Sequence, residues 1–88
     1  MTTQPDDDAS RVVLHVRSGC HLCDDARAAL AAAGVRWTEV DVDTGPASAD
    51  LVARYGDLVP VVSVDGVQQG FWRIDADRVV RALAAGPR

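Results

Sequence analysis

Two cysteines separated by two residues are the side chains of this sequence best suited to chemistry. Cys20 and Cys23 are the only cysteines among its 88 residues, and they lie between an apolar run, Val12–Val16, and an alanine-rich segment that ends near Ala33. A Cys-x-x-Cys pair where a strand gives way to a helix is typical of a dithiol redox site. The same spacing also supplies two of the four ligands that a zinc ion needs, so both interpretations stay open.

Thiol–disulfide exchange needs a thiolate that attacks and a second thiol that resolves the mixed disulfide. A helix N-terminus lowers the pKa of a cysteine placed there, which favours Cys20 as the nucleophile. Cys23 falls on the apolar stripe of the helix with Ala26 and Leu30, so we expect it to be buried and to act as the resolving thiol. His21 would favour the thiolate if protonated, or it is simply an exposed ring.

The elements that must position the pair follow from hydrophobic periodicity and turn residues. Asp65-Gly66 indicates a two-residue hairpin, and Asp75 can cap the last helix. The first strand does not alternate cleanly, so we expect burial on both of its faces. The predicted strands cover residues 11–16, 35–42, 58–64 and 67–71, and the predicted helices cover residues 20–33, 47–54 and 76–84. The order β-α-β-α-β-β-α predicts an α/β fold with a four-stranded mixed sheet flanked by helices.

Composition bounds the domain organisation and the classes of partner. Residues 1–10 contain Pro5 and an acidic triplet without an apolar anchor, so we expect a disordered tail followed by one domain over 11–85. The net charge is −4 and all nine basic residues are scattered arginines, which argues against nucleic acid. No run is long enough for a membrane span and the N-terminus does not resemble a secretory signal, so we expect a cytoplasmic protein. Nothing in the sequence demands a dimer, so we expect a monomer.

These residues together resemble the thioredoxin fold and, within it, the small bacterial glutaredoxins. Cys20-His21-Leu22-Cys23 stands where glutaredoxins have Cys-Pro-Tyr-Cys, and Val59-Pro60 stands where they have a Val-Pro with a cis peptide bond. Gly70 and Asp75 stand near their Gly-Gly-x-Asp segment. The resemblance covers about residues 11–84 and implies a dithiol oxidoreductase that holds no tightly bound cofactor.

The resemblance also implies a binding surface for the substrate or for a low-molecular-weight thiol. Arg17 stands where many glutaredoxins have a lysine that supports the thiolate or a ligand carboxylate; its alternative is a solvated strand end. In the family the backbone of the residue before the cis proline, here Val59, pairs with substrate. Asp75 and the helix that it begins would hold the charged groups of a thiol peptide, beside a simpler role as a helix cap.

The reductant and the activity itself have alternatives. Bulky Phe71 and Trp72 replace a glycine-rich stretch and are expected to obstruct glutathione, while Gly70–Asp75 also resembles a segment of redoxins that thioredoxin reductase reduces. The absence of lysine and asparagine suggests a GC-rich genome, and in an actinobacterium the thiol would be mycothiol. The other hypotheses are an iron–sulfur or other metal site, with His15 or His21 as a further ligand, and a non-catalytic partner-binding module.

Overall fold

The elements of the fold follow the predicted order, with one short helix added at the start. The structure is a computed structural model and describes residues 7–86. Its helices are α1 (Asp7–Arg11), α2 (His21–Ala32), α3 (Ser48–Tyr55) and α4 (Ala76–Ala85), and its strands are β1 (Val12–Val16), β2 (Thr38–Asp41), β3 (Val61–Val64) and β4 (Val67–Phe71). None of these helices has both the length and the apolarity to cross a bilayer.

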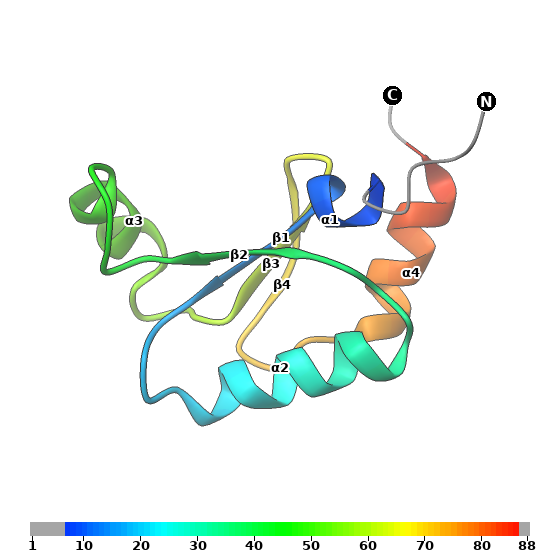
Figure 1. The fold of residues 1–88 in the computed structure, drawn as a ribbon, viewed down its shortest axis with the longest axis horizontal. Helices are drawn as coiled ribbons and strands as arrows, with labels where there is room; N and C mark the ends of the chain where they lie inside the picture. Colours follow the sequence, from blue (N-terminus) through cyan, green and yellow to red (C-terminus); the bar gives the residue numbers. More distant parts are fainter. Residues whose placement is uncertain (1–6, 87–88) are drawn as a thin grey trace.

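The four strands form one mixed sheet in the order β2-β1-β3-β4, as Figure 1 shows. β1 and β2 are parallel because α2 carries the chain back along the sheet between them. β3 pairs antiparallel with both β1 and β4, and the hairpin between β3 and β4 turns at Asp65-Gly66 as predicted. The mixed sheet and its flanking helices therefore confirm the predicted fold class.

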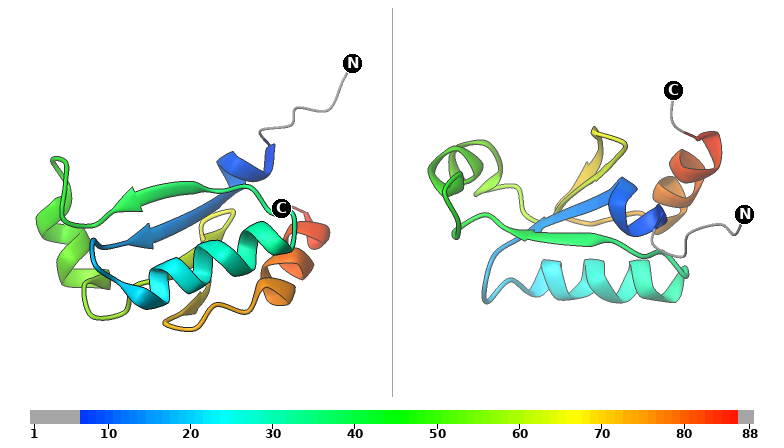
Figure 2. Two further views of the ribbon diagram at one scale, coloured as in Figure 1. Left: turned by 60° about the horizontal axis from the view of Figure 1, so that its bottom comes forward. Right: turned by 45° about the horizontal axis from the view of Figure 1, so that its top comes forward.

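One face of the sheet carries the hydrophobic core. Leu14 of β1, Leu30 of α2 and Val79 of α4 are completely buried in one cluster, which also contains Cys23. The apolar residues of α2 recur at helical spacing, so one stripe of this helix faces the sheet. Figure 2 shows α2 lying along the sheet and α4 at the opposite end of the molecule from α3. The chemistry-bearing helix is thus fixed by the best-packed part of the protein.

The other face of the sheet is covered thinly. Val13 and His15 point away from the core and are only half-buried, and α3 has no buried residue at all. The contact made here is the Tyr55 ring, whose centroid lies 4.5 Å from that of His15. The expectation that β1 is buried on both faces is therefore wrong for the half-buried Val13 and His15, although Val61, the register partner of His15 on β3, is buried on this face.

The start of the domain differs from the expected tail. Residues 1–6 lie outside the described part of the chain, but Asp7–Arg11 forms the single helical turn α1 instead of a tail and a strand start. The Thr38 hydroxyl of β2 donates to the Ala9 carbonyl, and the Arg11 guanidinium binds Asp65 at 2.9 Å. These partners are far away in the sequence, so the local composition did not indicate them.

Two predicted strands begin later than expected, for local reasons. The chain after α2 first completes the helix end, where the Val35 N–H donates to the Leu30 carbonyl at 3.0 Å, and β2 starts only at Thr38. β3 starts at Val61 because the preceding Pro60 has no N–H to donate to a neighbouring strand.

Candidate active site

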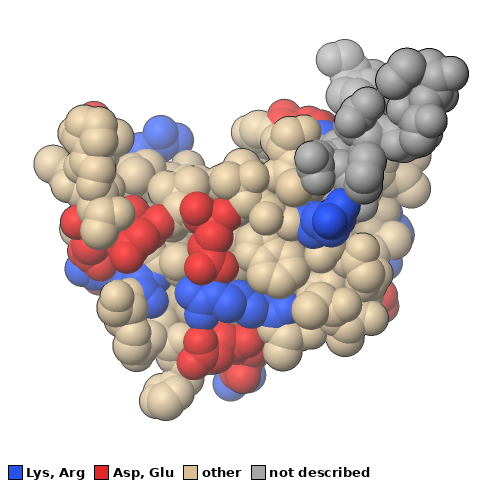
Figure 3. All heavy atoms as spheres, in the orientation of Figure 1, with Lys and Arg blue, Asp and Glu red and all other residues tan. Residues whose placement is uncertain are grey.

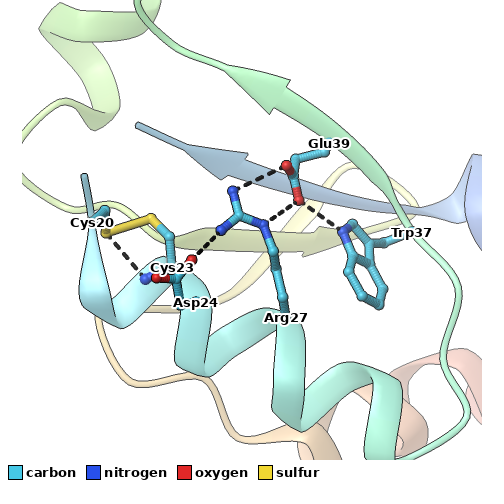
Figure 4. Close-up of polar contacts among 6 residues, drawn as sticks. All are labelled: Cys20, Cys23, Asp24, Arg27, Trp37 and Glu39. Carbon is cyan, nitrogen blue, oxygen red and sulfur yellow. Dashed lines mark hydrogen bonds and ion pairs between the residues drawn. A yellow bond between two sulfur atoms is a disulfide. The ribbon is translucent and has the colours of Figure 1, made fainter. Parts of the chain in front are cut away.

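The cysteine pair sits at the N-terminus of α2, directly beyond the carboxyl end of β1. Gly19 turns the chain there with a φ of 69°, and Cys20 is the extended residue that caps the helix. The two cysteines are joined by a disulfide, with their Cα atoms 5.2 Å apart, inside the usual range for such a bond. Figure 4 shows the disulfide on the first turn of α2.

The helix start provides the electrostatic environment that a thiolate needs. The Cys23 N–H donates to the Cys20 sulfur at 3.1 Å, so the sulfur occupies the position of an N-cap acceptor. Unpaired N–H groups and the helix dipole favour negative charge at this place. The sequence therefore folds so that an anionic Cys20 sulfur would replace the side-chain oxygen that caps most helices.

The two sulfurs differ in their access to solvent. Cys23 is fully buried in the core cluster together with Ala26 and Leu30, as its place on the apolar stripe predicted. Cys20 is half-buried, and His21 beside it is exposed. A disulfide partner arriving from solvent can therefore reach Cys20, while Cys23 is shielded behind it.

A charged network that the sequence analysis missed links α2 to β2 next to the cysteines. The Arg27 guanidinium contacts Asp24 at 2.7 Å and Glu39 at 2.9 Å, and the Trp37 indole N–H donates to Glu39 at 3.2 Å (Figure 4). The hydrogen bond from Arg27 holds the pKa of Glu39 below its ordinary value. Only Asp24 and Arg27, three residues apart on one helix, gave a local signal for it.

Arg17 lies where it was expected, at the end of β1, but its charge is engaged elsewhere. Its guanidinium donates to both carboxylate oxygens of Asp43, at 2.8 and 2.9 Å, and to the Gly56 carbonyl at 3.1 Å. The hydrogen bond to Asp43 raises the pKa of Arg17 above its ordinary value. These contacts tie β1 to the chain on either side of α3, which favours a structural role over support of the thiolate.

Positively and negatively charged side chains lie next to one another on this side of the molecule. On the face drawn in Figure 3, blue arginine atoms lie between groups of red acidic atoms. The described ion pairs of Arg17, Arg27 and Arg11 each join an arginine to a carboxylate within 3 Å. Among residues 7–86, no group of three or more histidine, cysteine, aspartate or glutamate side chains is placed to hold a metal ion.

The segment before β3 has the geometry that the resemblance implies. The Val59-Pro60 peptide bond is cis, and Pro60 is buried. Val59 and Cys20 both pack against the core cluster that contains Cys23. Within the described residues, no hydrogen bond is made by the N–H or the carbonyl of Val59.

Trp72, which the sequence marks as a bulky residue beside the site, has a backbone conformation that the sequence did not predict. It has a φ of 62°, which is unusual for a bulky side chain, whereas Gly70 has ordinary backbone angles. Its indole ring is 51% exposed and stands edge-on to the 42% exposed ring of Phe71, with centroids 5.2 Å apart. No sequence pattern signals a left-handed tryptophan, because glycine, asparagine and aspartate are the residues that usually occupy this conformation.

Asp75 caps α4 as predicted. Its Oδ1 accepts hydrogen bonds from the Asp77 and Arg78 N–H groups at 3.0 and 3.3 Å. Its other oxygen has no hydrogen bond within the described residues, so the carboxylate retains an acceptor for a ligand. Gly70 lies in β4, and a Cβ added there would make only ordinary contact with Ile74.

A narrow cleft runs between α2 and the connection from β4 to α4. It has a volume of about 190 Å³, and its lining residues are Leu22, Asp25, Ala26, Ala29, Trp72, Arg73 and Ile74. Leu22 belongs to the first turn of α2, the helix that carries the cysteines, but neither cysteine lines the cleft. A larger cleft of about 580 Å³ lies at the other end of β4, around Val64 and Val67, and contains no cysteine.

Comparison with known proteins assigns the chain to a family. Residues 11–84 match the glutaredoxin-like domain family (DUF836). An uncharacterised protein of Mycobacterium tuberculosis is 32% identical over 80 residues, which cover 84% of this chain and 82% of that protein.

Solved structures agree with this assignment. The crystal structure of a structural-genomics target protein from X. campestris is 35% identical, with a TM-score of 0.67, and the match covers 86% of this chain and 99% of that one. Glutaredoxin C1 of a poplar hybrid shares the fold, with 22% identity, a TM-score of 0.56 and coverage of 92% and 82%. The chain therefore belongs to the glutaredoxin-like family of thioredoxin-fold proteins.

Proposed function

We propose that this protein is a thiol–disulfide oxidoreductase in which Cys20 is the nucleophile and Cys23 the resolving thiol. The observation that carries the proposal is the asymmetry of the pair at the helix start. The sulfur of the half-buried Cys20 accepts the Cys23 N–H at 3.1 Å, and Cys23 is completely buried behind it. Membership of a glutaredoxin-like family supports the same chemistry.

The reaction would proceed in two exchanges. In the reduced protein, the Cys20 thiolate attacks one sulfur of a substrate disulfide, forms a mixed disulfide, and releases the other substrate sulfur as a thiolate that takes up a proton. The Cys23 thiol then loses its proton and attacks the Cys20 sulfur. This step releases the second substrate thiol and leaves the Cys20–Cys23 disulfide, so two electrons pass to the substrate.

The open backbone of Val59 would orient the substrate. An extended segment next to the substrate disulfide could pair with the free N–H and carbonyl of this residue, as the resemblance implies. The proposed substrates as a whole are disulfides of proteins or small molecules. We place the activity in the cytoplasm, where reducing conditions regenerate the dithiol.

The reductant would be a low-molecular-weight thiol or a reductase. Glutathione, mycothiol and thioredoxin reductase are the three candidates. For a thiol peptide, the free oxygen of Asp75 and the N-terminus of α4 offer sites for charged groups. The exposed rings of Phe71 and Trp72 stand at the same connection and would restrict this approach.

A single-turnover experiment tests the proposal without knowledge of the reductant. Protein reduced with dithiothreitol and then freed of it is mixed with bis(2-hydroxyethyl) disulfide, and the thiols released are counted. Wild type should release two thiols for each protein molecule and Cys20→Ser none. Cys23→Ser should stop at a mixed disulfide that mass spectrometry detects on Cys20.

The thiol pKa of Cys20 gives an independent test. The pH dependence of alkylation by iodoacetamide should place it below the unperturbed value of about 8.5. A wild-type protein that releases no thiol and titrates at about 8.5 would exclude the proposed activity. Parallel regeneration with the three candidate reductants then identifies the electron donor.

A further inference from the structure

The starting observation is the conformation of Trp72, which lies directly after β4. A bulky residue with a φ of 62° is a backbone outlier, and outliers persist only where surrounding contacts hold them. The Trp72 N–H donates to the Pro60 carbonyl at 2.9 Å and to the Leu58 carbonyl at 3.2 Å. Its indole N–H donates to the Asp57 carbonyl at 2.9 Å. One residue thus holds three carbonyls of the segment before β3.

These three bonds surround Val59 without using it. The carbonyls of Leu58 and Pro60 point to Trp72, while the N–H and carbonyl of Val59 take part in no hydrogen bond within the described residues. Fixing both neighbours restricts the rotation of the Val59 backbone. Its two groups are therefore held in place and unpaired before any substrate arrives, which reduces the entropy lost on binding.

The position of the Trp72 side chain connects this segment to α2, the helix that carries the cysteines. Trp72 lines the cleft of about 190 Å³ together with Leu22, which lies between Cys20 and Cys23. The cleft is smaller than the 300–1,000 Å³ of ordinary small-molecule pockets. Its size suits a single side chain of a bound segment better than an enclosed small molecule.

We propose that Trp72 is a positioning residue that presents the Val59 backbone to disulfides carried on extended polypeptide. The inference rests on the proposed oxidoreductase activity and specifies its substrate class. A polypeptide disulfide gains backbone hydrogen bonds to Val59, whereas a small disulfide without amides gains none. Trp72 itself touches no reacting atom and acts through the segment that it holds.

The experiment compares two disulfides in single turnover with the reduced protein. One is bis(2-hydroxyethyl) disulfide, which has no amide. The other is the symmetric disulfide of a blocked pentapeptide with cysteine at its centre and alanine elsewhere. The readout is the ratio of the two second-order rate constants, together with the half-saturating concentration of the peptide disulfide.

Three variants separate the contributions. Trp72→Phe removes the indole N–H and keeps a smaller aromatic ring, and Trp72→Gly removes the side chain and relieves the backbone. Val67→Ala is the control, an exposed apolar residue at the far end of β4. We expect Trp72→Phe to lower the peptide-to-small-disulfide ratio about 3- to 10-fold, mainly by raising half-saturation, as loss of one ordering hydrogen bond would. Val67→Ala should keep the wild-type ratio.

A modified substrate provides the second arm. Methylation of the peptide nitrogens on both sides of the cysteine removes the backbone donors, so wild type should lose most of its preference while Trp72→Phe loses little more. A wild-type ratio in both Trp72 variants, or equal rates for methylated and unmethylated peptide with wild type, would overturn the proposal. If Trp72→Gly does not fold, Trp72→Phe decides alone. If wild type reduces neither disulfide, the proposed function itself fails.

Discussion

The two faces of the sheet are built on different principles. On one face, Leu14 of β1 is completely buried in one cluster with Cys23 of α2 and Val79 of α4. On the other face, α3 buries none of its residues and is held by the Tyr55–His15 contact and by the hydrogen bonds of Arg17. The difference teaches why the cysteine pair sits where it does. A shielded resolving thiol requires a dry, closely packed environment, and the core cluster on the first face provides one around Cys23.

The largest expected difference between the faces is in the cost of truncation on β1. Leu14→Ala leaves a cavity in the core and should lower the free energy of unfolding by about 2–5 kcal/mol. Val13→Ala, one residue away on the half-buried face, should cost about 1 kcal/mol or less. Urea unfolding of the oxidised proteins measures both, and equal losses would contradict the distinction between the faces.

The next effect tests the N-terminal cap of α4, which packs on the face with the hydrophobic core. Asp75→Ala removes the acceptor for the Asp77 and Arg78 N–H groups and should destabilise the protein by about 1 kcal/mol. Asp77→Ala is the matched control, because Asp77 lies in the same first turn and its side chain does not cap the helix. Thermal unfolding of the two variants should separate them; similar midpoints would show that the cap contributes little.

An effect of similar size is expected on the thinly covered face. Tyr55→Ala removes the ring that packs on His15 and should cost about 0.5–1.5 kcal/mol, whereas Tyr55→Phe keeps the ring and most of the stability. Amide hydrogen exchange should show faster exchange in Ser48–Tyr55 in the alanine variant and unchanged exchange in α2. Faster exchange throughout α2 would mean that the two faces are not independent.

The smallest expected effect is a pH dependence of the folding stability that originates at His15, on the thinly covered face. Burial holds the pKa of His15 below its ordinary value of 6.5, and the Arg54 cation acts in the same direction, while the Val61 backbone opposes it. Nδ1 of His15 is buried without a partner among the described residues. The unfolded chain therefore binds a proton at His15 more readily than the folded chain does. The contribution of neutral His15 to folding stability is complete above pH 6.5 and is lost as the pH falls toward the lowered pKa of the folded state.

The measurement compares unfolding of the oxidised protein at about pH 7.5 and about pH 5.5, on either side of the ordinary histidine pKa. Wild type should lose stability at the lower pH, and His15→Leu should lose less. His21→Asn, which changes the exposed histidine, is the control and should behave like wild type. The same loss in His15→Leu as in wild type would assign the pH dependence to other groups.

Much of the fold could be predicted because its signals are local. The Asp65-Gly66 turn, the Asp75 cap and the apolar stripe through Cys23 each depend on residues within one or two turns of chain. The cysteine pair was equally recognisable, since its spacing alone places one sulfur at a helix start and the other one turn inside. The family resemblance covered the same residues that the family match covers.

The tertiary structure decided which distant groups meet. Arg17 binds Asp43, Trp72 holds the carbonyls before β3, and one face of β1 remains only half-buried. None of these outcomes follows from periodicity or propensity, because each depends on a partner brought near by strand pairing and helix packing. The sequence by itself therefore determined where the two sulfurs stand on their helix. The folded chain determined what surrounds them, and with it the backbone that a substrate would meet.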